Sequence, residues 1–350
     1  MYEFGILQKN IDNIKCFFYN IIRTNDRHNN KCSAVVFMDN NDIRLITRAA
    51  HMYYDDNMTQ QAISDKLGIS RPAVSRLLKK AREEGIVEIN INSPYSFSQQ
   101  ERQIEKLYGL REVIIVPYYN DENIKLKKIL GKAAALYLTR VIKDGDIIGV
   151  SWGTTLYCML ENLKVGRQYD VVFVSLVGGI GNTQIEVHSN QLVINFSRIF
   201  GGKGQFLHAP AIVDSIEVKK SISSDKKIRE VLELGQKSNI ALVGIGSPDS
   251  TTMMKAGYFS TRDIQELKEA GVIGDICSQF FDIQGRLCNA EMNQRGIGLT
   301  LDQLKKIPLV IGVAGGTLKM KSILGALRGG YLDVLVTDSK TAKFLIETGG

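Results

Sequence analysis

Six short apolar runs, rich in β-branched residues, succeed one another after residue 111, and stretches with helical spacing separate them. The runs cover residues 113–116, 147–150, 171–177, 240–245, 309–313 and 332–337. The main helical stretches cover residues 126–142, 155–163, 190–200, 226–236, 261–270 and 320–327. A strand that is apolar at nearly every position is buried on both faces. The alternation therefore predicts an α/β fold: a Rossmann-like parallel sheet enclosed by helices.

The chain has 350 residues, which is enough for two domains. Residues 1–37 are rich in Asn and show no clear helical period, so we expect a disordered or extraneous arm, or alternatively one extra helix over residues 11–22. Residues 38–95 then form a first domain, residues 96–110 a linker helix, and residues 111–350 a larger domain for a ligand and for oligomerisation.

Composition excludes several classes of protein. No run of eighteen apolar residues and no secretory leader occurs, so no membrane partner is predicted. The five cysteines form no CxxC pair, which favours a reduced, cytoplasmic protein. The four histidines lack metal-ligand spacing, so we expect neither a metal site nor a cofactor. The net charge of +7 permits a nucleic-acid partner without requiring one.

Residues 59–84 carry the strongest local pattern, that of a helix-turn-helix. A helix from Asp42 presents Ile43, Ile46, Ala50 and Tyr53 on one stripe. A second helix begins at the predicted N-cap Thr59 and stops at Gly68, and a third begins at Ser70 and stops at Gly85. The alternating stretch 86–91 fits the strand of a wing.

The third helix concentrates positive charge. Five basic and no acidic residues lie between positions 70 and 82, which is the electrostatic signature of phosphate binding. Arg71, Ser75 and Arg76 lie near the helix N-terminus, where bases are contacted, whereas Lys79 and Lys80 suit phosphates. The alternative is a solvated basic helix in a bundle. The predicted DNA-binding residues are Thr59, Gln60, Ser70, Arg71, Pro72, Ser75, Arg76, Lys79 and Lys80.

The segment Ser-Trp-Gly-Thr-Thr at 151–155 follows one apolar run and precedes a helix. Small residues let a backbone approach an anion, hydroxyl groups donate hydrogen bonds to it, and a helix N-terminus adds positive potential. These features make Ser151, Gly153, Thr154 and Thr155 candidate anion ligands. The alternative is an ordinary strand-to-helix turn. No Walker A sequence occurs, so nucleotide hydrolysis is not predicted.

Other strand ends are also rich in glycine, namely Gly178-Gly179, the loop around Gly246, and residues 314–317. In an open α/β sheet, ligands bind at the carboxyl ends of the strands, so these loops fit one shared pocket. Lys319 could neutralise a phosphate, and Asp275 could accept hydrogen bonds from sugar hydroxyls. The alternatives are tight turns, a surface lysine and a turn aspartate.

Taken in order, residues 58–89, 145–156, 240–248, 274–287 and 315–338 resemble the SorC family of bacterial sugar-responsive transcriptional regulators. The resemblance covers about residues 40–348 and departs from the family only in the first 37 residues. It implies a winged helix-turn-helix joined to a domain similar to phosphosugar isomerases. Ser151, Gly153, Thr154 and Thr155 would then hold the phosphate, and Asp275 and Lys319 match the family's effector-binding Asp and Lys.

The resemblance also implies a homotetramer that binds double-stranded operator DNA and changes its affinity with a phosphorylated sugar effector. We therefore expect a regulator of a carbohydrate-utilisation operon with no catalytic residues. The rival hypothesis is a phosphosugar isomerase or deaminase with a DNA-binding appendage. The loop at 244–249 lacks the histidine that such deaminases show, and the loop after Val177 lacks a lysine for a Schiff base.

Overall fold

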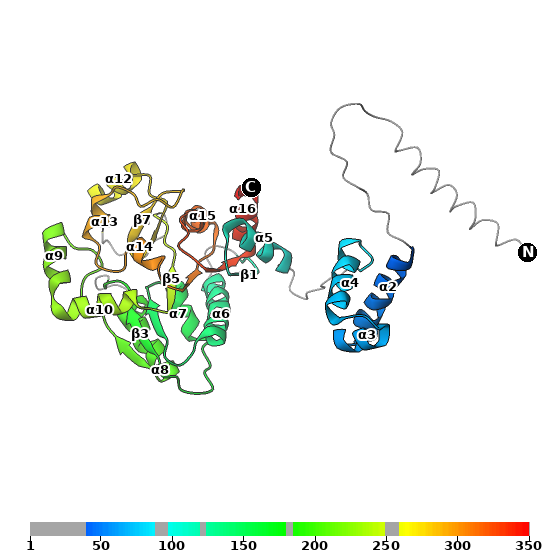
Figure 1. Cartoon of the computed structure of the whole chain (residues 1–350). Helices are drawn as coiled ribbons and strands as arrows, with labels where there is room; N and C mark the ends of the chain where they lie inside the picture. The colour runs from blue at the N-terminus through cyan, green and yellow to red at the C-terminus, as the bar shows by residue number, and fades with distance from the viewer. Residues whose placement is uncertain (1–39, 88–96, 120–123, 180–184, 249–258, 350) are drawn as a thin grey trace, which may run out of the picture. The chain divides into compact units, whose positions relative to one another are not determined.

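A computed structural model describes residues 40–87, 97–119, 124–179, 185–248 and 259–349 (Figure 1). The chain divides into two compact units, Met1–Asn92 and Ser93–Gly350. The predicted arm over residues 1–37, with its alternative helix over residues 11–22, lies outside the described residues.

The described part of the N-terminal unit, residues 40–87, holds three helices, α2 (Asn40–Tyr54), α3 (Gln60–Leu67) and α4 (Arg71–Glu83). Its core consists of side chains at helical spacing from all three, which pack together and exclude water. The most deeply buried of these are Ile46, Ala49, Ile63, Val74 and Ala81. The predicted helix-turn-helix is therefore confirmed. The apolar stripe predicted for the first helix differs from the structure at one position, because Ile43 is 41% exposed.

Local chemistry fixes the turn of this motif. The Oγ1 atom of Thr59 accepts a hydrogen bond from the backbone N–H of Ala62 at 3.2 Å, so the predicted N-cap is confirmed. Gly68 ends α3 in the left-handed region with φ of 67°, where residues with a Cβ are strained. Ser70 is the N-cap residue of α4, but its side chain makes no capping hydrogen bond.

The predicted wing strand at 86–91 begins inside the described residues and ends outside them. Ile86 and Val87 form a bend, and the Val87 N–H donates to the carbonyl of Ala81 at 3.0 Å. Both side chains pack on the helices. Residues 88–91 lie outside the described residues, so the wing strand stays a prediction.

The larger unit is built on a seven-stranded sheet in the order β1-β9-β8-β5-β2-β3-β4. All its strand pairs are parallel. The strands are β1 (Glu112–Val116), β2 (Ile147–Val150), β3 (Val172–Ser175), β4 (Lys203–Gln205), β5 (Ile240–Gly244), β8 (Leu309–Val313) and β9 (Val334–Asp338). All six predicted runs form strands here, and β4 was not predicted. Neither was the antiparallel hairpin of β6 (Gly274–Ile276) and β7 (Gln279–Phe281).

Helices cover both faces of the sheet (Figure 1). They are α5 (Ser98–Tyr108), α6 (Ile124–Val141), α7 (Thr154–Leu160), α8 (Ser189–Phe200), α9 (Ile216–Ser224), α10 (Lys226–Gln236), α12 (Thr261–Glu269), α13 (Glu291–Arg295), α14 (Leu301–Leu304), α15 (Met320–Arg328) and α16 (Ser339–Thr348). One core joins the sheet to α6, α7 and α8. The other joins it to α5, α15 and α16.

Alternate residues of one strand enter opposite cores. In β9, Val334 and Val336 pack with α6, whereas Leu335 packs with α15 and α16. All five residues of β8 and of β9 are buried. This two-sided burial is what the continuous apolar runs require, and it confirms the predicted α/β class.

The segment predicted as a linker helix, residues 96–110, contains α5. This helix belongs to the C-terminal unit, and its Ile104 is fully buried in the core beside β1. Two carboxylates of α5 also bind the adjacent strand: Glu105 accepts from the N–H of Val113, and Glu101 from that of Ile115. The helix is therefore part of the sheet-containing unit rather than a free connection.

The strand order reverses once, between β2 and β5. From β2 the chain adds β3 and then β4 on one side, and it returns to place β5, β8 and β9 on the other side. A parallel sheet opens a crevice at the carboxyl ends of the strands where its order reverses, because the two connections leave in opposite directions. The switch point thus lies between Val150 of β2 and Gly244 of β5.

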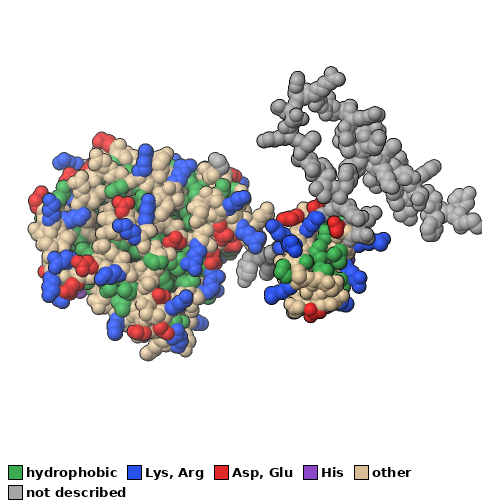
Figure 2. All heavy atoms as spheres, viewed as in Figure 1, with side chains coloured by type: hydrophobic (Ala, Val, Ile, Leu, Met, Phe, Trp, Pro, Cys, Tyr) green, Lys and Arg blue, Asp and Glu red, His purple; other side chains and the backbone are tan. Residues whose placement is uncertain are grey.

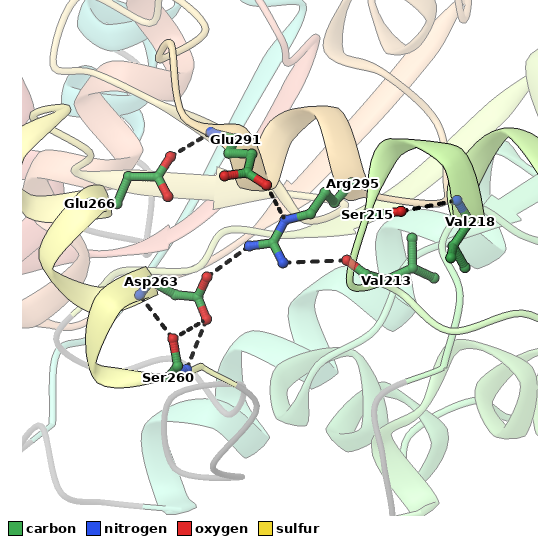
Figure 3. Close-up of polar contacts among 8 residues, drawn as sticks. All are labelled: Val213, Ser215, Val218, Ser260, Asp263, Glu266, Glu291 and Arg295. Atoms are coloured by element: carbon green, nitrogen blue, oxygen red, sulfur yellow. Dashed lines mark hydrogen bonds and ion pairs between the residues drawn. The ribbon is translucent and has the colours of Figure 1, made fainter.

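Arg295 ties together three segments that follow β4, β5 and β7 (Figure 3). Its Nη2 atom donates to Oδ1 of Asp263 in α12 at 2.7 Å, and its Nη1 atom donates to the carbonyl of Val213 at 3.5 Å. Nε lies 3.8 Å from Oε1 of Glu291. Asp263 also closes a capping box with Ser260. The network fixes the layer of helices beside the switch point.

None of the helices that the structure describes is long and apolar enough to span a bilayer. Within the described ranges, no group of three or more potential metal ligands comes together. Cys158, Cys277 and Cys288 are buried and unpaired.

Candidate functional site

The predicted DNA-reading face of α4 is exposed to solvent. Ser70, Arg71, Ser75, Arg76 and Lys79 are all exposed, while Val74, Leu78 and Ala81 are buried on the opposite side. Figure 2 shows Lys and Arg side chains on the surface of the N-terminal unit. Of the remaining predicted contacts, Thr59 and Pro72 are exposed, and Gln60 and Lys80 are half-buried. The helix therefore presents its basic side chains to a partner while its apolar side chains hold the unit together.

A hollow of about 780 Å³ adjoins the start of α4. It is lined by Tyr53, Tyr54, Asn57, Met58, Thr59, Gln60, Gln61 and Arg71. Hydroxyl, amide and guanidinium groups of this kind donate to DNA phosphates. The sequence singled out Thr59, Gln60 and Arg71 of this set. It missed Asn57, whose φ of 53° marks a special turn but leaves no periodic signal.

In the larger unit, the loop after β2 is held from both sides. The N–H of Ser151 donates to the carbonyl of Leu242 in β5 at 2.9 Å. On the other side, the N–H of Gly153 donates to the carbonyl of Val187 at 3.1 Å, and Ser189 Oγ donates to the carbonyl of Val150 at 2.7 Å. Gly153 has φ of 143°, which favours glycine. The loop leads Thr154 and Thr155 into the first turn of α7.

Three consecutive residues at the end of β5 contact three predicted site elements. The N–H of Gly244 donates to Ser151 Oγ at 3.1 Å. The carbonyl of Ile245 accepts from Lys319 Nζ at 2.6 Å. The N–H of Gly246 donates to the carbonyl of Asp275 at 2.9 Å. Ser151, Lys319 and Asp275 are far apart in the chain, and this strip brings them to one place at the switch point.

Asp275 and Lys319 are an acid and a base with shifted pKa values. Asp275 is only 4% exposed, and burial raises the pKa of its carboxyl to about 6, although the positive charge of Lys319 and the N–H of Ser278 oppose the rise. Burial lowers the pKa of the Lys319 ammonium to about 8, and the charge of Lys127 lowers it further against the attraction of Asp275. Such perturbed pairs in a crevice are typical of functional sites.

The Gly178-Gly179 pair lies next to this crevice but already uses its amides. The N–H of Gly178 donates to the carbonyl of Ile297, and that of Gly179 to the carbonyl of Ala209. A Cβ on Gly178 would lie 2.4 Å from the carbonyl oxygen of Pro210. Close packing of two backbones therefore accounts for Gly178, and neither N–H is available to a ligand.

Asp338 is a residue of this edge that sequence reasoning missed. It is fully buried, and its Oδ2 atom accepts from the N–H of Gly316 at 2.7 Å and from Thr341 Oγ1 at 2.7 Å. Its Oδ1 atom accepts from two N–H groups at the start of α16. Asp338 thereby fixes the loop that carries Lys319. The available signal was an aspartate directly after an apolar run, which is typical of a helix N-cap.

Two family models match the chain. Residues 94–347 match the model described as "Putative sugar-binding domain", and residues 38–88 match the model described as "Winged helix-turn-helix DNA-binding". The deoxyribonucleoside regulator of Bacillus subtilis is 37% identical over 311 residues, which are 88% of this chain and 99% of that protein. The sorbitol operon regulator of Klebsiella pneumoniae is 33% identical over 315 residues, or 88% and 99% of the two chains.

The chain belongs to the SorC family of transcriptional regulators. The full-length sorbitol operon regulator SorC of Klebsiella pneumoniae has a similar solved structure, with a TM-score of 0.68 at 34% identity over 88% of this chain and 99% of that one. A DeoR family regulator from Listeria monocytogenes matches with a TM-score of 0.66 at 32% identity, over 72% and 100% of the two chains.

This SorC-family chain is therefore a DNA-binding regulator with a sugar-binding domain that responds to a small molecule. The relatives named above are regulators, not enzymes, so the rival hypothesis of a phosphosugar isomerase or deaminase is set aside. The predicted fold class is confirmed in both units.

Proposed function

We propose that this regulator controls a carbohydrate-utilisation operon and that a phosphorylated sugar, bound at the carboxyl ends of β2, β5 and β8, changes its affinity for operator DNA. The observation that carries the proposal is the strip Gly244–Gly246. It joins the loop of Ser151, the cation of Lys319 and the carboxyl group of Asp275 at the topological switch point.

The loop 151–155 supplies the phosphate ligands in this proposal. The hydroxyl groups of Thr154 and Thr155 and the backbone N–H of Thr154 are the proposed donors, because they lie at the start of α7. The N–H of Gly153 already donates to Val187, so Gly153 contributes by letting the backbone approach the phosphate. Ser151 Oγ is already an acceptor for the N–H of Gly244 and orients the loop. Gly178 and Gly179 shape the neighbouring wall and donate no hydrogen bond to the ligand.

The sugar portion lies between Asp275 and Lys319 in this proposal. A buried carboxylate accepts two sugar hydroxyl hydrogen bonds well, and the ammonium neutralises negative charge on the ligand. The backbone around Gly246 lies between these two groups and admits the ligand because it has no side chain there. In this proposal, polar groups of the ligand interact with the Asp275 carboxyl group and the Lys319 ammonium group, which burial has removed from water.

We further propose a cytoplasmic homotetramer whose helix-turn-helix units bind operator half-sites about one DNA turn, ~34 Å, or its multiples apart. The effector favours one arrangement of the tetramer over another, and the spacing of the α4 helices follows. The relatives' names support a sugar or nucleoside context: one is a deoxyribonucleoside regulator and the other a sorbitol operon regulator.

A mobility-shift titration with the promoter upstream of the chain's own gene tests the proposal. Sugar phosphates should change the apparent Kd for DNA, and the matching free sugars should not. In parallel, a thermal-shift screen should show stabilisation by phosphorylated sugars, since a ligand at 100 times its Kd adds about 2.7 kcal/mol. Stabilisation by free sugars alone would contradict the phosphate assignment.

The Thr154→Ala variant tests the proposed phosphate site in the same screen. It removes one proposed phosphate donor and should weaken the response to the sugar phosphate without changing DNA affinity in its absence. An exposed threonine on the DNA-binding unit, Thr59, provides the opposite control, because Thr59→Ala should leave effector binding intact. Equal effects of both variants on effector binding would argue against the site.

A further inference from the structure

Two polar side-chain atoms are buried without a hydrogen-bond partner in the layer where α5 covers the sheet. They are Oε1 of Gln100 in α5 and Oγ1 of Thr337 in β9, and Thr337 is fully buried. Among the described residues, the one other such atom is Nε of Arg295, which lies near the carboxylate of Glu291. A buried polar atom without a partner destabilises the arrangement that holds it. An arrangement that pairs the two oxygens would therefore gain free energy.

The two oxygens face the same layer of the core. Thr337 follows Leu335 by two residues, so both share one face of β9, and Leu335 packs in the core that joins the sheet to α5 and α16. Gln100 precedes Ile104 by four residues, so it shares the helix face that Ile104 buries in the same core. Figure 1 shows α5 beside β1 and α16, and it contacts both.

The register of the sheet places the two oxygens at the same level. Oε1 of Glu101 accepts from the N–H of Ile115 at 2.9 Å, so the first turn of α5 lies beside the end of β1. Ile115 is also the residue of β1 that is in register with Thr337 in β9. Neighbouring strands lie about 4.8 Å apart. Gln100, which precedes Glu101, is therefore at the level of Thr337 and one strand away from it.

Each member of this pair belongs to a different part of the regulatory connection. α5 is the first described helix of the C-terminal unit, so the chain that leaves the DNA-binding helices enters this unit through it. Thr337 precedes Asp338, whose carboxylate accepts from the N–H of Gly316 in the loop that carries Lys319. A hydrogen bond between Gln100 and Thr337 would join α5 to that loop.

We propose that Gln100 and Thr337 couple operator binding to the ligand domain: Thr337 Oγ1 donates a hydrogen bond to Gln100 Oε1 in the operator-bound protein, and the two separate in the free protein. A small shift of α5 on DNA closes the pair, and an effector that holds the loop of Lys319 opposes the closure through Asp338. The operator part of this inference rests on the DNA-binding function of the family, and its link to the effector rests on the proposed function.

Promoter binding by the full chain tests the pair without any effector. Thr337→Val removes the hydroxyl group and keeps the shape of the side chain, and Gln100→Met removes the carboxamide. Each should raise the Kd for the promoter fragment upstream of the chain's own gene by about tenfold, the factor that one buried hydrogen bond supplies. The double variant should bind as each single variant does, because the same bond is lost once. Gln99→Met, at an exposed position of α5, should bind as the parent chain.

Thermal unfolding of the chain without DNA gives a second readout. Thr337→Val and Gln100→Met should keep or raise Tm, since each removes a buried oxygen that has no partner. Thr341→Val is the matched control and should lower Tm, because Thr341 is equally buried but its hydroxyl group donates to Asp338 at 2.7 Å.

Three results would overturn the proposal. A lower Tm for Thr337→Val would mean that its hydroxyl group is already bonded in the free protein, to a water molecule or to another group. Unchanged promoter affinity in both single variants would mean that the pair does not close on DNA, and additive losses in the double variant would mean that the two side chains do not interact. These measurements use no sugar phosphate, so their failure is distinguishable from a failure of the proposed function.

Discussion

The two units differ in whether the residues proposed to bind a ligand also stabilise the fold. In the N-terminal unit, most of the side chains proposed to contact DNA lie on the exposed face of α4, and none belongs to the apolar core. Thr59, which caps α3, is the one with a structural role as well. In the C-terminal unit, the proposed effector ligands are themselves structural. Ser151 binds the end of β5, Lys319 binds Ile245, and Asp275 is buried beside Gly246.

This difference follows from how each ligand is recognised. DNA presents an extended charged surface, so an exposed basic helix suffices, and water screens its charges when it is free. A small ligand must be enclosed, so its contacts come from buried groups that the fold has to accommodate without the ligand. Substitutions should therefore change binding alone in the first unit and both binding and stability in the second.

The largest effect is expected at Asp338, which has no proposed contact with a ligand. Asp338→Ala removes the acceptor of four hydrogen bonds and leaves the loop of Lys319 unanchored. Loss of a fully buried network of this kind should lower the free energy of unfolding by about 4 kcal/mol. Chemical denaturation of the C-terminal unit measures the change.

Asp302→Ala is the control for that substitution. Asp302 is exposed in the first turn of α14, so its removal should change stability by no more than about 0.5 kcal/mol. If Asp338→Ala proved equally mild, the hydrogen bonds of Asp338 would contribute little to the stability of the C-terminal unit.

Asp275→Asn should increase the free energy of unfolding, whereas Asp338→Ala should lower it. Asparagine keeps an acceptor for the N–H of Ser278 but cannot ionise, so it avoids the cost of a buried charge. We expect the variant to be more stable than the parent chain by about 3 kcal/mol at pH 7, from a pKa raised to about 6. It should also lose effector binding, which thermal shift with a bound sugar phosphate would reveal.

The raised pKa of Asp275 also predicts how the stability of the folded chain changes with pH. Because the pKa of Asp275 is raised in the folded state, the folded chain holds a proton between about pH 4 and pH 6 that the unfolded chain has released. The contribution of Asp275 to stability therefore falls as pH rises through this window and stays low above it. Asp275→Asn should remove this slope. A slope that persists unchanged would assign it to another group.

The sheet was predictable where burial is two-sided. The six apolar runs form six strands because each is apolar at nearly every position and has no polar face to expose to solvent. The edge strand β4 has the sequence Lys-Gly-Gln and is held by backbone pairing with β3, so hydrophobicity carries no signal there. The β6–β7 turn places Cys277 and Ser278 at φ of 52° and 61°, conformations that these residue types rarely adopt and so do not predict.

The site was predictable in its parts and not in its assembly. Each glycine-rich strand end had a local signal, but the strip at Gly244–Gly246 depends on the order of the strands in the sheet. Glycine is also ambiguous as a signal. Gly246 lies between Asp275 and Lys319, whereas Gly178 is small because the backbone of Pro210 lies against it. Sequence alone does not distinguish a glycine proposed to admit a ligand from one that makes room for a neighbouring backbone segment.

In the N-terminal unit, Arg76→Ala should change DNA binding and little else. Arg76 is exposed and lies one turn into α4, so its loss should weaken specific operator binding by about 2 kcal/mol if it contacts a base. Stability should change by no more than about 0.5 kcal/mol. Lys66→Ala, an exposed lysine at the end of α3, is the matched control. Equal operator affinity for both variants in a mobility-shift titration would contradict the assignment.

The smallest effects compare two N-cap residues that the sequence treats alike. Thr59 caps α3 through its hydroxyl group, so Thr59→Ala should cost about 1 kcal/mol of stability. The hydroxyl group of Ser70 makes no capping hydrogen bond, so Ser70→Ala should cost less than half as much. Because that hydroxyl is exposed beside Arg71, its proposed role is a DNA contact, and Ser70→Ala should weaken operator binding severalfold. Thermal unfolding and a mobility shift on the same two variants decide between the roles. Ser70→Ala could instead lower stability as much as Thr59→Ala and leave DNA affinity unchanged. Ser70 would then have a structural role, and it would not belong to the set of residues that contact DNA.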